Sequence, residues 1–213
     1  MDSKFGYVVV EGPIGVGKTS LVRRLADVMG SEVFLEQPEA NPFLERFYQS
    51  PRQYALPTQL FFLFQRAKQI EQLKQGDMFR PGCVADFMLE KDRLFAETTL
   101  ERDELHLYEQ VYNHVKLELP QPDLVIYLQA PVNVLIERIR RRGIRYEQYA
   151  QQDYLERLSD AYMQFFYRYN NAPLLMVNTA ELNFVDDDRD FRLLLEHIET
   201  MGPGRHFFNP VRV

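Results

Sequence analysis

Apolar residues follow two patterns along this chain: short continuous runs, and longer segments in which they recur every three or four positions. The short runs are typical of buried strands, and the periodic segments are typical of helices with one buried face. Five runs are expected to form strands: Phe5–Val10, Val33–Leu35, Gly82–Ala85, Leu124–Leu128 and Leu174–Val177. Eight segments are expected to form helices: Thr19–Met29, Phe43–Tyr48, Thr58–Gln75, Arg93–Leu100, Asp103–Leu119, Val132–Arg142, Asp153–Tyr169 and Asp190–Met201. This alternation predicts a parallel sheet with helices on both faces.

Two segments are expected to lie outside the alternation. The stretch Pro51–Pro57 predicts a break before the long third helix, because proline lacks the backbone N–H that a helix interior needs. The tail Gly202–Val213 is expected to be a loop. No internal repeat or linker divides the sequence. We therefore expect residues 1–213 to form one α/β domain of three layers with a five-stranded parallel sheet.

Composition narrows the classes of partner. A formal net charge of −6 argues against a nucleic-acid partner, because neutralising a phosphate backbone requires a basic face. No stretch approaches the roughly 18 apolar residues of a membrane span. The apolar run Tyr7–Val10 is too short for a signal peptide. We therefore expect a cytoplasmic protein with no membrane partner.

Cysteine and histidine give little sign of redox or metal chemistry. Cys83 is the one cysteine of the sequence, so it cannot form an internal disulfide, and its apolar surroundings predict a packed strand thiol. The four histidines are scattered along the chain. A metal cage made only of protein ligands is therefore not expected.

The most specific motif is a glycine-rich loop between the first predicted strand and helix. It fits the pattern G-x-x-x-x-G-K-[ST] and reads Gly12, Pro13, Ile14, Gly15, Val16, Gly17, Lys18 and Thr19. Glycines allow backbone N–H groups to turn toward phosphate oxygens, and the helix N-terminus adds its dipole. Lys18 is expected at the β- and γ-phosphates and Thr19 at Mg²⁺, with Ser20 as a further nucleotide contact. The motif predicts a P-loop fold that binds ATP and Mg²⁺.

Two carboxylates follow the second and third predicted strands. In an open parallel sheet, ligands bind beyond the carboxyl ends of the strands, which is where Glu36 and Asp86 are expected. A phosphotransferase needs one carboxylate near Mg²⁺ and one group that takes the proton of the acceptor. Both residues are candidates for either role.

A dense cluster of arginines follows the fourth predicted strand. Its members are Arg138, Arg140, Arg141, Arg142 and Arg145. Residues three or four apart share one helix face, and a solvated basic face is the simple interpretation. In a net acidic chain, a cluster that ends at Gly143 favours a mobile lid at about residues 138–150, whose arginines offset charge on a transferring phosphoryl group.

With the glycine-rich loop, the two carboxylates after the strands and the arginine cluster in this order, the sequence resembles the deoxynucleoside kinase family from about Tyr7 to the last helix. Tyr48 precedes Gln59 by eleven residues, and Gln59 precedes Arg66 by seven. The similar positions also include the loop from Glu11, the segment Glu36-Gln37-Pro38-Glu39-Ala40-Asn41-Pro42, the six-residue spacing from Asp86 to Asp92, and Glu147 after the arginines.

This resemblance implies a role for each position. Glu36 would accept the proton of the sugar 5′-hydroxyl, and Asp86 would lie near Mg²⁺ and the same hydroxyl. Tyr48 and Glu147 would bind the 3′-hydroxyl. Gln59 would bind the base edge, which suits an amide that both donates and accepts hydrogen bonds. The remaining implied contacts are a charged pair at the far end of the base pocket, Arg66 and Asp92, and two lid arginines, Arg138 and Arg142.

Two positions depart from the family pattern. Phe87 stands where most members have an arginine after the third-strand acid, and Lys91 or Arg93 is a candidate replacement. An aromatic residue at this position resembles the pattern of a bacterial branch of the family, that of the deoxyguanosine and deoxyadenosine kinases. Ile144 stands where an arginine commonly follows the lid glycine, and Arg145 is the candidate replacement.

The family resemblance implies an enzyme of nucleotide salvage that moves the γ-phosphoryl group of ATP to a deoxynucleoside 5′-hydroxyl. The charged pair would crowd a thymine methyl, so deoxyadenosine or deoxyguanosine is expected first and deoxycytidine next. A homodimer through the helices between Leu100 and Tyr169 is also implied. One alternative is a nucleoside-monophosphate kinase such as thymidylate kinase, with Arg46, Arg52 or Arg66 binding the acceptor phosphate. Another is a non-catalytic P-loop binding module.

Overall fold

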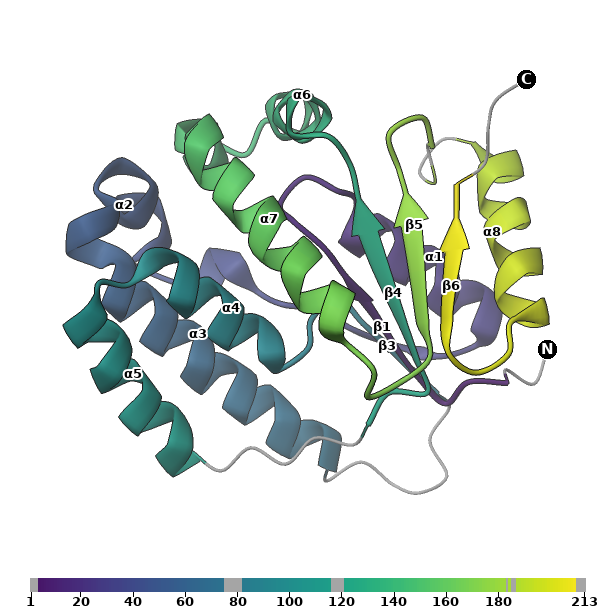
Figure 1. Cartoon of the computed structure of the whole chain (residues 1–213), viewed down its shortest axis with the longest axis horizontal. Helices are drawn as coiled ribbons and strands as arrows, with labels where there is room; N and C mark the ends of the chain where they lie inside the picture. The colour runs from purple at the N-terminus through teal and green to yellow at the C-terminus, as the bar shows by residue number, and fades with distance from the viewer. Residues whose placement is uncertain (1–3, 75–81, 116–120, 183, 185–186, 210–213) are drawn as a thin grey trace.

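A twisted parallel sheet forms the middle layer of the molecule (Figure 1). The computed structural model describes residues 4–74, 82–115, 121–182, 184 and 187–209. Six strands pair in the order β2-β3-β1-β4-β5-β6, and every neighbouring pair is parallel. They are β1 (Tyr7–Glu11), β2 (Glu32–Phe34), β3 (Cys83–Ala85), β4 (Leu124–Gln129), β5 (Leu174–Asn178) and β6 (Arg205–Phe208). The expected three-layer α/β fold with a parallel sheet is confirmed.

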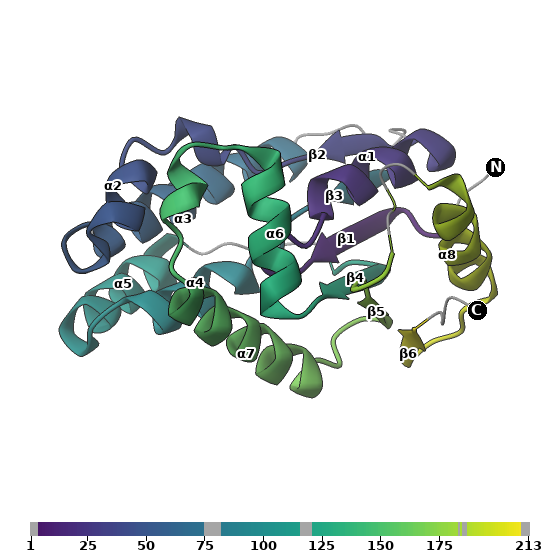
Figure 2. The ribbon, with the colours of Figure 1, turned by 90° about the horizontal axis from the view of Figure 1, so that it is seen from above.

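Helices cover both faces of this sheet. They are α1 (Lys18–Met29), α2 (Leu44–Gln49), α3 (Pro51–Lys74), α4 (Glu90–Thr99), α5 (Arg102–Val115), α6 (Val132–Arg142), α7 (Gln152–Arg168) and α8 (Asp188–Thr200). Two single-turn 3-10 helices, η1 (Pro38–Ala40) and η2 (Tyr146–Tyr149), lie in loops. Figure 2 shows α1 and α8 on one side of the sheet, α7 on the other, and α6 across the strand ends.

The two faces of the sheet bury separate apolar cores, which explains why the inner strands β1, β3, β4 and β5 have no polar face. In β1, Val8 points into the core beneath α1 and α8, whereas Val9 points into the core beneath α4 and α7. The second core is rich in stacked aromatic rings, and the centroids of Tyr127 and Phe166 are 4.3 Å apart. Because successive strand residues point to opposite faces, a strand covered on both sides must be apolar throughout.

The prediction of five strands was short by one. The tail expected to be a loop contains β6, which pairs with β5 at the edge of the sheet. Its side chains alternate between half-buried and exposed, and Phe208 packs against the first core beside His197. An edge strand with one wet face has no continuous apolar run, so the pattern used for the buried strands does not detect it.

The predicted break at Pro51–Pro57 was also wrong, because α3 runs through it. Pro51 occupies the first helical position, where the N–H is unpaired in any helix. Pro57 lies inside the helix and removes one backbone hydrogen bond there. Burial of this stretch offsets that loss, since Ala55 and Thr58 are at most 1% exposed. Tertiary packing has overridden the local signal.

One other helix start differs from the expectation by more than two residues. The helix expected at Arg93 begins at Glu90, so Lys91 and Asp92 fall in the first turn of α4. The expected ends of the third and fifth helices, Gln75 and residues 116–119, lie outside the described residues. None of the helices in the described ranges combines the length and apolar character that a membrane crossing requires.

Candidate active site

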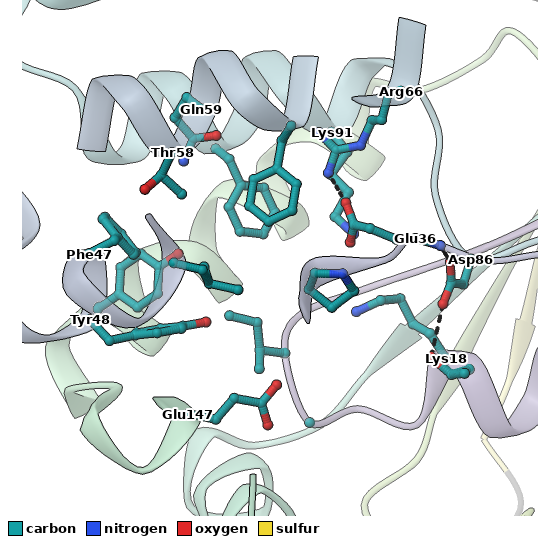
Figure 3. Close-up of a pocket in the computed structure, with 18 of the residues that line it drawn as sticks. Lys18, Glu36, Phe47, Tyr48, Thr58, Gln59, Arg66, Asp86, Lys91 and Glu147 are labelled. Atoms are coloured by element: carbon teal, nitrogen blue, oxygen red, sulfur yellow. Dashed lines mark hydrogen bonds and ion pairs between the residues drawn. The ribbon is translucent and has the colours of Figure 1, made fainter. Parts of the chain in front are cut away.

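A cavity opens beyond the carboxyl ends of the central strands, between the glycine-rich loop, α3 and the turn after α6 (Figure 3). The predicted residues that line it come from distant parts of the sequence: Ile14, Gly15, Lys18, Thr19, Glu36, Tyr48, Gln59, Arg66, Asp86, Arg142 and Glu147. Seven predicted residues do not line this cavity, namely Gly12, Pro13, Val16, Gly17, Ser20, Asp92 and Arg138. Asp92 is fully buried and contacts Arg66, and Arg138 faces a second cavity on the other side of the loop.

The glycine-rich loop needs glycine at its first position for a steric reason. Gly12 has a φ of +148°, and a Cβ atom there would lie 2.3 Å from the backbone oxygen of Leu128. The loop leads directly into α1, whose N-cap is Gly17. The backbone N–H groups at this N-terminus have no helical acceptor, so they are free to bind an anion.

Lys18 lies across the loop that it follows. Its Nζ donates to the backbone oxygens of Gly12, at 2.7 Å, and Pro13, at 3.1 Å. Burial and the nearby Lys91 ammonium lower the pKa of Lys18 to about 8. A phosphate group beside this ammonium would favour its charged form, because an opposite charge nearby raises the pKa of a lysine.

Asp86, which follows β3, joins the first turn of α1 to the segment after β2. Its Oδ2 accepts from the Thr19 hydroxyl at 2.9 Å, and its Oδ1 accepts from the Glu36 backbone N–H at 2.7 Å. The carboxylate is 4% exposed. Asp86 therefore places one oxygen beside the hydroxyl of the phosphate loop and fixes the backbone from which Glu36 projects.

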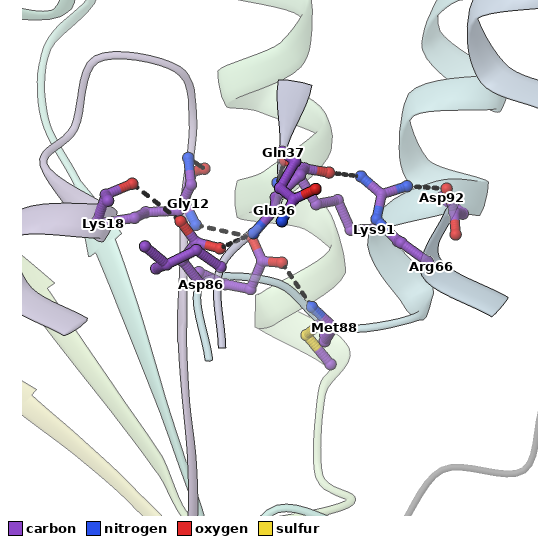
Figure 4. Close-up of polar contacts among 12 residues, drawn as sticks. Gly12, Lys18, Glu36, Gln37, Arg66, Asp86, Met88, Lys91 and Asp92 are labelled. Carbon is purple, nitrogen blue, oxygen red and sulfur yellow. Dashed lines mark hydrogen bonds and ion pairs between the residues drawn. The ribbon is translucent and has the colours of Figure 1, made fainter. Parts of the chain in front are cut away.

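Two cations hold the Glu36 carboxylate (Figure 4). Its Oε1 accepts from Arg66 and its Oε2 accepts from Lys91 at 2.8 Å. Burial by itself would raise the pKa of Glu36, but the charges of Arg66 and Lys91 outweigh it and lower the pKa to about 2. The side chain is thus an ionised carboxylate at neutral pH, near both Lys18 and Asp86.

The far wall of the cavity comes from α3 and α4. Arg66 bridges the Glu36 and Asp92 carboxylates, and its side chain is 3% exposed. Gln59 is 2% exposed and donates from Nε2 to the Thr99 hydroxyl at 3.3 Å. Polar groups here are few and fixed, and they can pair only with a ligand that has matching donors and acceptors.

Aromatic side chains and one carboxylate form the opposite wall. The ring of Tyr48, on α2, stacks on Tyr146 of η2 with centroids 6.1 Å apart. Glu147 is 5% exposed and accepts hydrogen bonds from the guanidinium of Arg142. Burial raises the pKa of the Tyr48 hydroxyl well above its usual value, so it stays protonated. Tyr48 and Glu147 therefore offer one hydroxyl and one carboxylate to the same cavity.

The second cavity lies between the phosphate loop, α6 and the loop after β5. Arg138 crosses it and donates to the Thr179 hydroxyl at 2.9 Å and to the backbone oxygens of Thr179 and Leu182. Arg142 lines both cavities. In this structure Arg138 holds the loop after β5 to the phosphate loop, whereas Arg142 lies between the two spaces.

The three candidate replacements for the missing arginines differ in where their side chains lie. Phe87 is 2% exposed and packs against Phe34, with ring centroids 5.8 Å apart. Lys91 lines the cavity. Arg93 is exposed and pairs with glutamates on the surface. Arg145 is exposed too and lines neither cavity.

Sequence reasoning missed one buried carboxylate, that of Glu11. It is 1% exposed and accepts hydrogen bonds from the Gly12 N–H, the Met88 N–H and the Tyr162 hydroxyl, at 3.0, 2.9 and 3.0 Å. It therefore connects the phosphate loop to the segment after Asp86. The available signal was a carboxylate that ends a wholly apolar strand, since a buried charge requires partners.

Comparisons with known proteins agree with this geometry. The deoxynucleoside kinase family matches residues 8–201. The chain is 32% identical over 204 residues to the deoxyguanosine kinase of Bacillus subtilis (strain 168), covering 92% of this chain and 97% of the relative. It is 29% identical over 206 residues to the deoxyadenosine kinase of Lactobacillus acidophilus, covering 90% and 94%.

A solved structure shows the same arrangement of elements. The deoxyadenosine kinase from M. mycoides with bound dCTP superimposes with a TM-score of 0.78 at 25% identity, over 92% of this chain and 100% of that one. The region matched by the family, residues 8–201, includes every element that contributes to the cavity. The chain therefore belongs to the deoxynucleoside kinase family.

Proposed function

We propose that this protein transfers the γ-phosphoryl group of ATP to the 5′-hydroxyl of a deoxynucleoside. One observation carries the proposal: a single cavity joins the phosphate loop, through Lys18, to the ionised Glu36 and the neutral polar side chain of Gln59. A triphosphate and a neutral acceptor with a base can therefore meet there. Positioning and charge stabilisation supply most of the rate in such a transfer.

The residues of the cavity suit distinct steps of this reaction. Glu36 accepts the proton of the 5′-hydroxyl while that oxygen forms its bond to the γ-phosphorus. The bond from that phosphorus to the bridging oxygen breaks, and its electron pair stays on the departing diphosphate. Lys18 and Arg142 offset the charge on the phosphate oxygens. Tyr48 and Glu147 bind the 3′-hydroxyl and fix the sugar.

Mg²⁺ fits beside Thr19 and Asp86. A hydroxyl and a carboxylate oxygen, 2.9 Å apart, are the oxygen ligands that Mg²⁺ takes when phosphates and water complete its coordination. Within the described ranges, no group of three or more histidine, cysteine or acidic side chains is arranged to hold a metal. When bound, the ion would neutralise charge between the β- and γ-phosphates.

A purine deoxynucleoside is the proposed acceptor. Arg66, which is paired with the buried Asp92, lines one part of the cavity, and Gln59 lines it seven residues earlier on α3, where its amide can pair with a base edge. A thymine methyl has no place against two buried charges. The relatives named deoxyguanosine and deoxyadenosine kinases support this order, with deoxycytidine next.

Monophosphate acceptors fit this cavity less well. Arg46 and Arg52, which were candidates for binding an acceptor phosphate, do not line it. Arg46 lies against the rings of Phe43 and Tyr54, and Arg52 points into solvent. Arg66 is already paired with two carboxylates. The cavity therefore favours a neutral nucleoside.

The direct test is ATP turnover with each of the four deoxynucleosides and their monophosphates, measured by coupled ADP release. We expect deoxyguanosine or deoxyadenosine to give the highest kcat/KM. Glu36→Gln should lower kcat by about 10²–10⁴-fold, the usual contribution of a general base, while ATP binding persists. Thymidine as the best substrate would refute the pocket argument, and turnover of monophosphates alone would refute the proposed acceptor class.

We also propose that residues 138–150 act as a lid, that the chain works as a single domain, and that it forms a homodimer in the cytoplasm. Helix α7 supports the dimer, because Met163 and Tyr167 on its outer face are 52% and 74% exposed. Gly143 supports the lid, because its φ of +70° ends α6 beside the cavity. Analytical ultracentrifugation would test the dimer, and a monomer at micromolar concentration would refute it.

A further inference from the structure

Lys91 is a buried cation, and the sequence offers it as one of two candidates for the charge that Phe87 does not supply. It lies in the first turn of α4 and is 5% exposed. Its Nζ is 2.8 Å from Glu36 Oε2 and lies over the ring of Phe95, 5.7 Å from the ring centroid. Lysine is almost never buried without a partner, so the contact with Glu36 accounts for its position.

Lys91 completes a neutral group of four charges. Arg66 bridges Glu36 and Asp92, and Lys91 takes the second oxygen of Glu36. Two carboxylates are thus matched by two cations, and each oxygen of Glu36 contacts a different one. A carboxylate held at both oxygens has little freedom to rotate, whereas one held at a single oxygen can turn.

The backbone explains why the cation comes from this position. Phe87 follows the third-strand acid directly, but its ring is buried against Phe34 and supplies no charge. The chain then turns into α4, and the Lys91 N–H donates to the Met88 backbone oxygen at 3.3 Å. That turn brings the side chain of Lys91 back to Glu36. Arg93, two residues later, points to the surface.

We propose that Lys91 is a positioning residue for phosphoryl transfer, whose ammonium fixes the Glu36 carboxylate and supplies the charge that Phe87 does not. The inference rests on the proposed function, in which Glu36 accepts the proton of the acceptor. Lys91 acts through that carboxylate. Its removal should therefore affect the chemical step more than the binding of the nucleoside.

The first experiment compares Lys91→Met with Arg93→Met in steady-state assays with the best deoxynucleoside. Lys91→Met should lower kcat by about 100-fold, the scale of a misplacement of about 1 Å at a reacting group. It should change the nucleoside KM by less than about 3-fold, because other side chains hold the nucleoside in the proposed pose, and a loss confined to kcat marks an interaction that matters only in the transition state. Arg93→Met, from the same helix, should leave both constants unchanged. Equal losses in the two variants, or an unchanged kcat in Lys91→Met, would overturn the proposal.

The second experiment restores the charge without the side chain. Lys91→Ala leaves space for a small amine, so ethylammonium should recover at least tenfold of the lost kcat, and tetramethylammonium at equal ionic strength should not. Lys91→Met fills the space and should show no recovery. A purely structural role would make Lys91→Ala insensitive to the amine, and that result would contradict the proposal even if the variant is less stable.

The two hypotheses fail in different ways. If wild type turns over no deoxynucleoside, or Glu36→Gln remains fully active, the proposed function or its base is wrong. If wild type is active, Glu36→Gln is inactive and neither Lys91 variant shows the predicted pattern, the role of Lys91 alone is wrong. If Lys91→Met fails to fold, Lys91→Gln replaces it, because glutamine keeps a hydrogen-bond donor without the charge. Lys91→Gln should reproduce the loss of kcat with an unchanged melting temperature. Full activity of Lys91→Gln would overturn the proposal.

Discussion

Replacing Arg66 should destabilise the protein far more than replacing a surface arginine. The side chains of Arg66 and Asp92 are 3% and 0% exposed, and Arg66 also contacts Glu36. Arg66→Met removes one charge and leaves Asp92 buried. Among the described residues, the second oxygen of Asp92 already has no hydrogen-bond partner. The variant therefore contains a buried carboxylate that has lost its counter-charge.

The expected magnitude follows from that burial. Removing one partner of a buried pair costs about 3–5 kcal/mol, because the remaining charge is uncompensated. For a chain of this size, each kcal/mol lowers the melting temperature by about 2–4 °C, so a fall of about 6–20 °C is expected. Glu36 keeps Lys91, which limits the loss to one orphaned group. In contrast, the exposed pairs of Arg93 predict less than about 1 kcal/mol for Arg93→Met.

Urea unfolding followed by circular dichroism measures the free energy of unfolding lost in Arg66→Met and in Arg93→Met. The double variant Arg66→Met with Asp92→Leu provides a sharper test, because replacing a buried pair by apolar residues is often neutral or stabilising. It should regain most of the stability that Arg66→Met loses, while remaining inactive. A cost for Arg66→Met no greater than that for Arg93→Met would refute the reasoning, since the pair would then behave as a solvated one.

Three further predictions concern other parts of the molecule. Gly12→Ala should lower the free energy of unfolding by about 1–3 kcal/mol or more, the cost of a strained backbone, because its Cβ would lie 2.3 Å from a β4 backbone oxygen. Denaturant unfolding measures this change, and Gly202→Ala is the control, because no atom lies within 4 Å of the Cβ at that position. Burial raises the pKa of Cys83 to about 11, so iodoacetamide should modify it about 100-fold more slowly at pH 8 than an ordinary thiol. That rate should rise about tenfold per pH unit up to pH 10, and mass spectrometry showing equal rates in folded and urea-unfolded protein would contradict it. Arg138→Met should raise the KM for ATP more than it lowers kcat, because Arg138 holds the loop after β5. Arg142→Met should mainly lower kcat. Initial-rate assays that give the reverse order would contradict this assignment of Arg138 to ATP binding and Arg142 to turnover.

The sequence by itself determined the sheet and the phosphate loop. Strands covered on both faces must be apolar throughout, so their signal is local and strong. The glycine spacing before Lys18 is local as well, because backbone turns and a helix N-terminus create the anion site within a few residues. Family resemblance added the distant positions, and the structure places most of them, from Glu36 to Glu147, around one cavity.

Only the tertiary structure decided how the charges pair. Arg66 contacts Glu36 as well as Asp92, and Lys91 rather than Arg93 reaches Glu36. These contacts depend on where α4 begins and on how α3 and α4 pack, and neither is a local property of the sequence. The edge strand β6 and the passage of α3 through Pro57 were likewise settled by packing. Local propensities differ by about 1 kcal/mol or less for most residues and by about 3 kcal/mol for a proline inside a helix. The burial of each large side chain contributes about 1.5–3 kcal/mol, so the packing of several such side chains decides where the two conflict.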